Sequence, residues 1–147
     1  MTPSAKASSQ RTRDIGQALV EFALVLPIFL LLVPGLVDVG RLVYINNALA
    51  EGAREGARWG SVQGRSNLPA TNASSIQSHT LSIVAAVPNP TVTVACQTPL
   101  GYVPATCDTG DILTVTITSP VTMFTPVIGN LIGPRTLSAT SQMVVNQ

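Results

Sequence analysis

The sequence predicts an α+β protein with a long N-terminal helix, membrane-spanning in its first half, then a second short helix and a small antiparallel sheet of about three strands. Three observations predict this fold. An apolar run covers residues 22–37, apolar and small residues recur at helical spacing as far as residue 60, and apolar residues alternate with threonine near residues 91–94 and 113–118. With 147 residues, the chain has room for one modest domain and an anchor.

The apolar run is long enough to cross a membrane as a helix. Between residues 15 and 37 the only charged side chain is Glu21. About 20 such residues cross a hydrocarbon core, and the run lacks the polar face that a helix of a soluble core shows. Pro27 and Pro34 are tolerable there as a kink or a local unwinding. A cleaved signal peptide is rejected, because the run is too long and no small-x-small site follows it.

The charges are concentrated in the first half of the chain. Only three of the eight basic and seven acidic residues follow residue 66, and a net charge of +1 gives no support for nucleic-acid binding. Three basic residues before the apolar run favour a cytoplasmic N-terminus: Lys6, Arg11 and Arg13. Arg41 and Arg54 follow the run at similar reach. Counting basic residues alone therefore does not settle the orientation. The cysteine pair and the low charge of the C-terminal part favour a C-terminus outside the cytoplasm.

Glu21 is the informative residue of the predicted span. A carboxylate inside a membrane helix costs about 2.5–3.5 kcal/mol on insertion scales, so it needs either a protonated state or a cationic partner. The alternative is that Glu21 lies at the interface and reaches water by extending its side chain.

The residues around Glu21 resemble two related groups of proteins. Residues 16–22, GQALVEF, resemble the processing motif of type IV prepilins and pseudopilins, in which a short basic leader ends in Gly and Glu is the fifth residue of the mature chain. Residues 16–58 are similar to the N-terminal region of TadE-like proteins, the pseudopilins of tight-adherence (Flp-type) pilus systems. The elements that carry this similarity are Gly16, residues 20–23, Pro27, Asp38, Gly40, Arg41 and residues 56–58. The sequence departs from the family in Pro34–Gly35 and in Phe22, where many members carry Tyr.

The resemblance implies a pilin-like fold and a processed N-terminus. A prepilin peptidase would cut between Gly16 and Gln17, and the new amine of Gln17 would pair with Glu21 of a neighbouring subunit and fix the register between them. The chain then divides into a cytoplasmic leader (1–16), a transmembrane helix (17–40), its extracytoplasmic continuation (41–63) and a small extracytoplasmic α+β domain (64–147). The implied partners are other pseudopilins or pilin subunits, the prepilin peptidase, the inner-membrane pilus secretion platform and the lipid bilayer.

Residues 38–60 continue at helical period beyond Asp38, which lies near the membrane exit. One face collects apolar and small residues: Leu42, Ile45, Leu49, Gly52, Ala53, Gly56 and Gly60. A polar strip lies opposite: Asn47, Glu51, Arg54 and Arg58. Glycine costs about 1 kcal/mol in a helix interior, so Gly52, Gly56 and Gly60 indicate close approach of another helix or a sheet. The alternative is fraying near Gly60. We expect Trp59 to pack against the domain as an apolar plug.

The C-terminal part predicts one helix and three strands after a linker at residues 64–69. Asn72 or Thr71 can cap a helix that runs to about Val87, where Pro88 ends it. Its apolar stripe is expected to be Ile76, Ile83, Val84 and Val87. The strands are expected near residues 91–94, 113–118 and 137–145, with one face toward the helices and a threonine-rich face outward.

The loop between the first two strands holds Cys96 and Cys107, which suit a disulfide in an oxidising compartment. Residues 119–134 form a long connection with an apolar set that either covers the core or contacts a partner subunit: Val121, Met123, Phe124, Val127, Ile128, Leu131 and Ile132.

The sequence shows no catalytic constellation, so we expect no enzyme, no cofactor and no metal. Asp108 and Asp111 fall short of a calcium loop and are interpreted as a solvated turn. His79 is expected to be exposed, and two cysteines do not complete a zinc site. The predicted function is that of a minor pseudopilin-like protein in the inner membrane, acting by helix–helix association. The alternative is an uncleaved, membrane-anchored extracellular binding or adhesion module.

Overall fold

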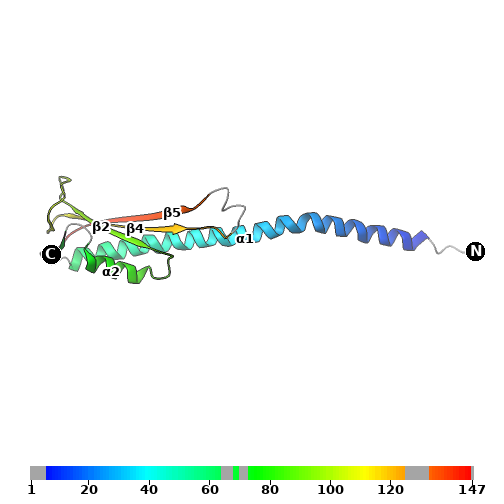
Figure 1. Ribbon diagram of the computed structural model, residues 1–147, viewed down its shortest axis with the longest axis horizontal. Coiled ribbons are helices and arrows are strands. Elements are labelled where there is room, and N and C mark those ends of the chain that lie inside the picture. Colours follow the sequence, from blue (N-terminus) through cyan, green and yellow to red (C-terminus); the bar gives the residue numbers. More distant parts are fainter. Residues whose placement is uncertain (1–5, 64–67, 70–72, 125–132, 147) are drawn as a thin grey trace, which may run out of the picture.

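The computed structural model describes residues 6–63, 68–69, 73–124 and 133–146 of the chain, and the side chains of its first helix from Gly16 to Val62. The first helix, α1 (Lys6–Gln63), is followed by β1 (Leu68–Pro69), α2 (Ser74–Ile83), β2 (Thr91–Gln97), β3 (Thr106–Cys107), β4 (Ile112–Val121) and β5 (Arg135–Val144). Figure 1 shows that every later element lies along the C-terminal half of α1, while the N-terminal half extends away alone. The predicted α+β fold is confirmed.

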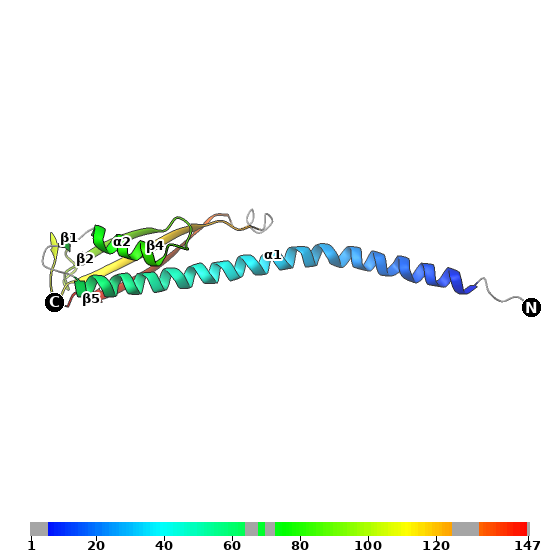
Figure 2. The ribbon, with the colours of Figure 1, turned by 90° about the horizontal axis from the view of Figure 1, so that it is seen from below.

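The helix α1 is a single element of 58 residues that continues through Pro27 and Pro34. Figure 2 shows it curving gently along its length. Each proline removes one backbone hydrogen bond, yet the helix continues on both sides of it. The apolar N-terminal half of α1 and the half that packs against the domain therefore belong to one uninterrupted helix.

Three strands form one antiparallel sheet in the order β2–β4–β5. In the register of this sheet Val94 lies opposite Val115, and Val115 lies opposite Ser141. Alternate residues of β2 and β4 are buried, so Val94, Val115 and Ile117 face inward, while the threonines between them face outward. The expected threonine-rich outer face is thus present. The strands are longer than expected, particularly β4, because pairing continues beyond the strictly alternating residues.

The helix α2 differs in its bounds from the helix predicted by the sequence. It begins after Ala73, which makes no side-chain capping bond, and it ends at Ile83 rather than at Val87. Asn72 and Thr71, the expected caps, lie outside the described residues. Val84 leaves helical geometry and the N–H of Val87 bonds to its carbonyl at 2.9 Å, so the chain already turns toward β2 before Pro88.

The stripe of α2 also departs from expectation. Ile76 and Val84 are buried, as expected, but Ile83 is exposed and Thr80 is fully buried. Thr80 can be buried in the stripe because its hydroxyl donates a hydrogen bond to the Ile76 carbonyl at 2.7 Å. Without this bond, burial would leave the hydroxyl without a partner.

The core lies between α1, α2 and the inner face of the sheet. Its fully buried large side chains come from all three layers: Ile45, Leu49, Ile76, Leu113, Ile117, Val84, Val94, Val115, Val121 and Val145. No such core side chain comes from α1 before Ile45 among the residues that the structure describes. The domain therefore buries only the second half of the long helix.

Candidate membrane and assembly site

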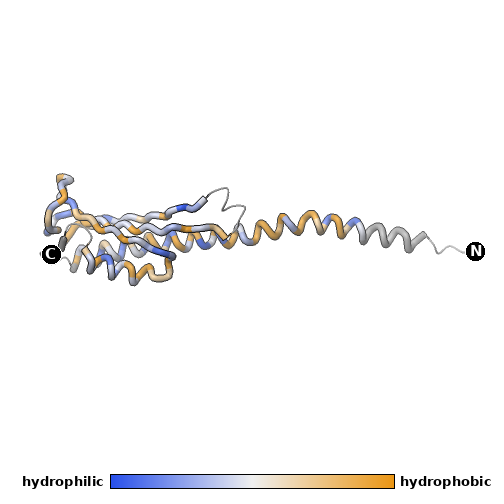
Figure 3. The backbone as a smooth tube through the Cα atoms, in the orientation of Figure 1, coloured by the Kyte–Doolittle hydropathy of each residue, from blue (hydrophilic) through white to orange (hydrophobic). Residues whose placement is uncertain are grey.

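The N-terminal half of α1 presents a continuous apolar surface that the domain does not cover. From Leu19 to Val37 large apolar side chains point away from the helix on all sides, and the most hydrophobic window of the helix is 0% buried. Figure 3 shows this segment as a mainly orange rod that extends beyond the domain. By length and composition it can cross a membrane. Within the described residues it is the one helix of this kind, and it indicates a single-pass membrane anchor.

The residues of the expected processing site lie at the start of that apolar segment. Gly16, Gln17 and Glu21 are exposed on α1, and nothing lies within 4 Å of the position that a Gly16 Cβ would take. Gln17 and Glu21 are four residues apart, so they lie on the same side of the helix one turn apart. The basic residues of the predicted leader lie N-terminal to the part of α1 whose side chains the structure describes.

Where the apolar segment ends, two residues of α1 bind the segment that directly follows β4. Asp38 is only 3% exposed, and its Oδ1 accepts a hydrogen bond from the Phe124 backbone N–H at 3.0 Å. The Arg41 guanidinium donates to the Thr122 carbonyl at 3.1 Å and lies 4.7 Å from the centre of the Phe124 ring. The sequence placed Asp38 near the membrane exit but gave no sign of this contact, since the partners are 86 positions apart.

Three glycines of α1 let the rest of the domain approach the helix backbone: Gly52, Gly56 and Gly60. A Cβ on Gly52 would meet the Val84 side chain and lie 3.1 Å from Ile117 Cδ1. A Cβ on Gly56 would meet Thr80, and one on Gly60 would lie 2.5 Å from Leu113 Cδ2 and 2.9 Å from Ile76 Cδ1. The four-residue spacing thus forms a smooth strip against which both α2 and the sheet pack.

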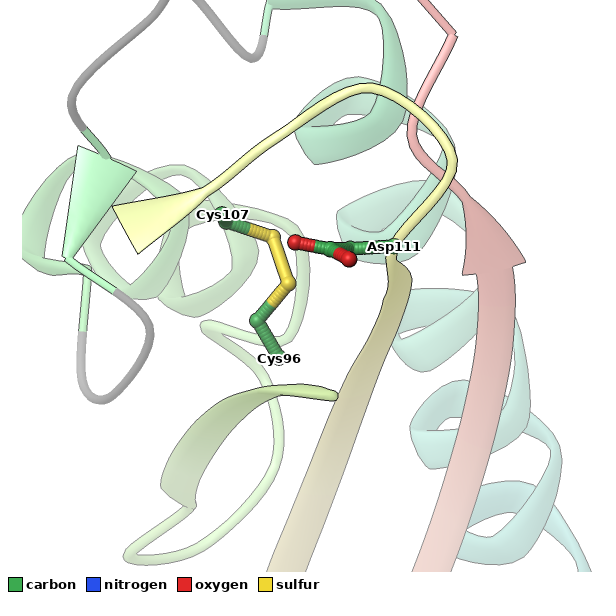
Figure 4. Close-up of side chains that lie close together, drawn as sticks. All are labelled: Cys96, Cys107 and Asp111. Carbon is green, nitrogen blue, oxygen red and sulfur yellow. A yellow bond between two sulfur atoms is a disulfide. The ribbon is translucent and has the colours of Figure 1, made fainter. Parts of the chain in front are cut away.

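Cys96 and Cys107 are joined by a disulfide between the end of β2 and β3, and both are buried. Figure 4 shows Asp111 beside this bond. Potential metal-binding atoms of these three residues lie within 4.8 Å of one another, but a disulfide leaves no thiolate to bind a cation. Asp111 is buried and its Oδ2 accepts from the Asp108 N–H at 2.9 Å, so the interpretation of a solvated turn is wrong for Asp111.

His79 is half-buried, which corrects the expectation of an exposed histidine. Its ring stacks on Trp59, with centroids 4.7 Å apart and an interplanar angle of 19°. Its Nε2 is buried, and no described group forms a hydrogen bond with it. Trp59 therefore packs against the domain, as expected, through a ring contact with α2. The periodicity of the sequence could not predict this contact, because the two residues lie in different helices, 20 positions apart.

The polar strip of α1 carries two ion pairs at i,i+3 spacing. Arg58 and Glu55 approach to 2.6 Å, and Arg54 and Glu51 to 3.8 Å. The hydrogen bond from Arg58 lowers the pKa of Glu55 and raises the pKa of the guanidinium itself. Both pairs lie on the surface of the helix that faces away from the core, where such pairs add little stability.

The apolar connection after β4 is only partly described. Val121 is buried, Met123 is half-buried and Phe124 is exposed. Val127, Ile128, Leu131 and Ile132 lie outside the described residues.

One comparison with known proteins finds a match. The model of the family described as TadE-like protein matches residues 16–58, which begin at the expected cleavage site and end within the glycine strip. No curated protein and no solved structure matches the chain. The family match agrees with the resemblance stated from the motif: over residues 16–58, the apolar helix and its continuation, the chain is similar to TadE-like proteins.

Proposed function

We propose that this protein is a minor pseudopilin-like component of tight-adherence pilus assembly, acting by lateral association of membrane helices after removal of its leader. The observation that carries the proposal is the family-matched helix itself. Its first half leaves its apolar surface free for lipid and neighbouring helices, while its second half is fixed to a folded domain. That division suits a subunit that is held in the bilayer and displays its domain outside the cytoplasm.

The proposed assembly step begins with cleavage between Gly16 and Gln17 by a prepilin peptidase. Cleavage places an ammonium at Gln17, one helical turn or about 6 Å along the axis from Glu21. In a bundle of apolar helices, the ammonium of one subunit neutralises the carboxylate of its neighbour, which removes the cost of two unpaired charges in lipid. Pairing in trans then fixes the axial offset between adjacent subunits.

The proposed partners follow from this step. Other pseudopilins or pilin subunits supply the neighbouring helices, and the inner-membrane pilus secretion platform holds the growing assembly. The domain lies on the exterior side, where an oxidising compartment keeps Cys96 and Cys107 bonded.

Replacing Glu21 with alanine tests the proposal. Glu21→Ala should abolish pilus assembly and leave membrane insertion intact, because removal of a carboxylate makes insertion easier. Glu51→Ala is the matched control, since Glu51 is an exposed carboxylate of the same helix with 73% of its side chain accessible. Pilus output is measured on cells, and insertion by resistance of the protein to carbonate extraction. Normal pilus output from the Glu21→Ala strain would refute the proposed mechanism.

A second candidate function is an uncleaved, anchored binding or adhesion module. The loop between β2 and β3 favours it, because Leu100, Tyr102 and Val103 are exposed at the end of the molecule far from the apolar helix. The Thr98 backbone N–H donates to the Tyr102 carbonyl at 2.8 Å, which orders this loop. Intact-mass measurement of the membrane-extracted protein separates the candidates, since retention of residues 1–16 supports the anchored module.

A further inference from the structure

The end of the domain that lies nearest the apolar half of α1 carries a second exposed surface with an aromatic ring, Phe124. Figures 1 and 2 show that β4 ends and β5 begins beside the middle of α1, at the end of the domain that faces the uncovered half of the helix. The contacts of Asp38 and Arg41 with residues 122–124 fasten this end of the sheet to α1.

The length of the apolar segment determines how far along α1 from the start of that segment this contact lies. From Gln17 to Val37 an α-helix rises about 30 Å, which equals the thickness of a typical hydrocarbon core. With Gln17 at the inner boundary of the hydrocarbon, Asp38, the residue after Val37, is level with the outer boundary. Because its carboxylate binds the Phe124 N–H, Phe124 lies at that same level.

The side chains at this level are those that bind a membrane interface. The Phe124 ring is 73% exposed, and Tyr44, one helical turn from Arg41, is 57% exposed. Tyrosine is enriched where hydrocarbon meets the headgroups, and phenylalanine is among the residues that interfacial helices bury at the boundary between headgroups and acyl chains. Asp38 does not oppose insertion, because it is already buried and hydrogen-bonded within the protein.

Charge also favours lipid as the occupant. Between Asp111 and Arg135 the sequence carries no charged residue. Arg135 lies opposite Val121 at this end of the sheet and is exposed, and its long side chain can place the guanidinium among the headgroups. A second cation at this end, Arg41, is held over the Phe124 ring and against the Thr122 carbonyl, a position compatible with the headgroup layer. The surface is also continuous with the membrane anchor, which brings lipid to it wherever α1 is inserted.

We propose that Phe124, positioned by Asp38 and Arg41, inserts into the exterior membrane interface and gives the domain a second point of attachment to the bilayer. With α1 as the first attachment, this contact fixes the tilt and the rotation of the domain relative to the membrane plane. The proposal rests on membrane insertion of α1 and is independent of the pilus role.

Site-specific tryptophan fluorescence in vesicles tests it. The full-length chain is reconstituted into phosphatidylcholine–phosphatidylglycerol vesicles in a Trp59→Phe background, with one new tryptophan per variant: Phe124→Trp, Tyr102→Trp or Leu30→Trp. Phe124 and Tyr102 are almost equally exposed, at 73% and 71%. Phe124 follows the end of β4, whereas Tyr102 belongs to the loop between β2 and β3, so the second is a matched control. Leu30→Trp reports insertion of the helix.

The expected result is a blue-shifted emission for Phe124→Trp and several-fold stronger quenching by phospholipids brominated near the headgroup end of their chains than for Tyr102→Trp. Leu30→Trp should be quenched by bromine placed deeper. If Leu30→Trp is quenched while Phe124→Trp emits like the Tyr102 variant, the interface contact is refuted and the anchor stands. A blue-shifted Phe124→Trp that bromine does not quench is covered by protein, and this also overturns the proposal. Absence of quenching at Leu30 refutes insertion itself, and the interface contact with it.

Discussion

The glycine strip of α1 makes a quantitative prediction at Gly56. A methyl group added there would meet the side chain of Thr80, with Cγ2 at 3.2 Å and Cβ at 3.3 Å besides the closer hydroxyl. Thr80 has little freedom to withdraw, because its β-branched side chain is stiff and fully buried. Its hydroxyl is also held by the Ile76 carbonyl at 2.7 Å.

The size of the effect follows from three contributions. Overpacking of a well-filled core costs about 1–3 kcal/mol. Rotation of Thr80 away from the new methyl would forfeit a hydrogen bond with a net value of about 0.5–1.5 kcal/mol. The higher helix propensity of alanine returns about 1 kcal/mol. The expected net loss for Gly56→Ala is therefore about 2 kcal/mol, which for a domain of this size lowers the melting temperature by roughly 8–15 °C.

The measurement is thermal and denaturant unfolding of the detergent-solubilised full chain, followed through the fluorescence of Trp59, whose ring stacks on α2. Gly40→Ala is the matched control, because nothing lies within 4 Å of a Cβ at that position of the same helix, and it should not destabilise the domain. Thr80→Ala should recover part of the loss when combined with Gly56→Ala, through a favourable coupling between neighbours. A stability of Gly56→Ala equal to that of Gly40→Ala would refute the close packing of α1 against α2.

Two further predictions concern the disulfide and the ion pair. Replacing Cys96 and Cys107 together with serine should lower the free energy of unfolding by about 2–3 kcal/mol, because the bond closes a short loop of the unfolded chain; an unchanged melting temperature in the same unfolding assay would contradict this. Because Arg58 lowers the pKa of Glu55 in the folded chain, the pair stabilises above the ordinary carboxyl pKa, and this stabilisation is lost as the pH falls through the lowered pKa. Melting temperatures recorded from neutral pH down to acid should therefore fall more for the parent than for Glu55→Gln, and parallel curves would argue against the pair.

Much of the architecture could be predicted because it depends on local periodicity. The face of α1 through Ile45, Leu49 and Gly56 repeats every three or four residues, and the structure buries these positions. The alternation around Val94 and Val115 likewise places valine inward and threonine outward. Such patterns are visible in the sequence because one surface of each element is buried along its whole length.

The contacts that connect distant segments could not be predicted in this way. The hydrogen bond between Asp38 and Phe124 joins two segments that are far apart in the sequence, and no repeating pattern connects them. In addition, an aspartate next to an apolar run looks the same in the sequence whether it is buried in the protein or lies at the membrane interface. The stack of His79 on Trp59 depends on how α2 packs against α1. Strand β3, which carries Cys107, has two residues and is too short to show alternation.

The unbroken course of α1 links the membrane half of the chain to the position of the domain. The glycine strip and the contacts of Asp38 fix the domain to one side of the helix, and no helix end intervenes between them and Glu21. Because an α-helix has a fixed rise and rotation per residue, Glu21 then has a defined direction relative to the domain. Under the proposed assembly, a pairing that sets the offset between two helices would also set which faces of two neighbouring domains meet. Under that proposal, the smooth strip at Gly52, Gly56 and Gly60 would have a consequence beyond stability, since it would transmit the register chosen in the bilayer to the domains outside it.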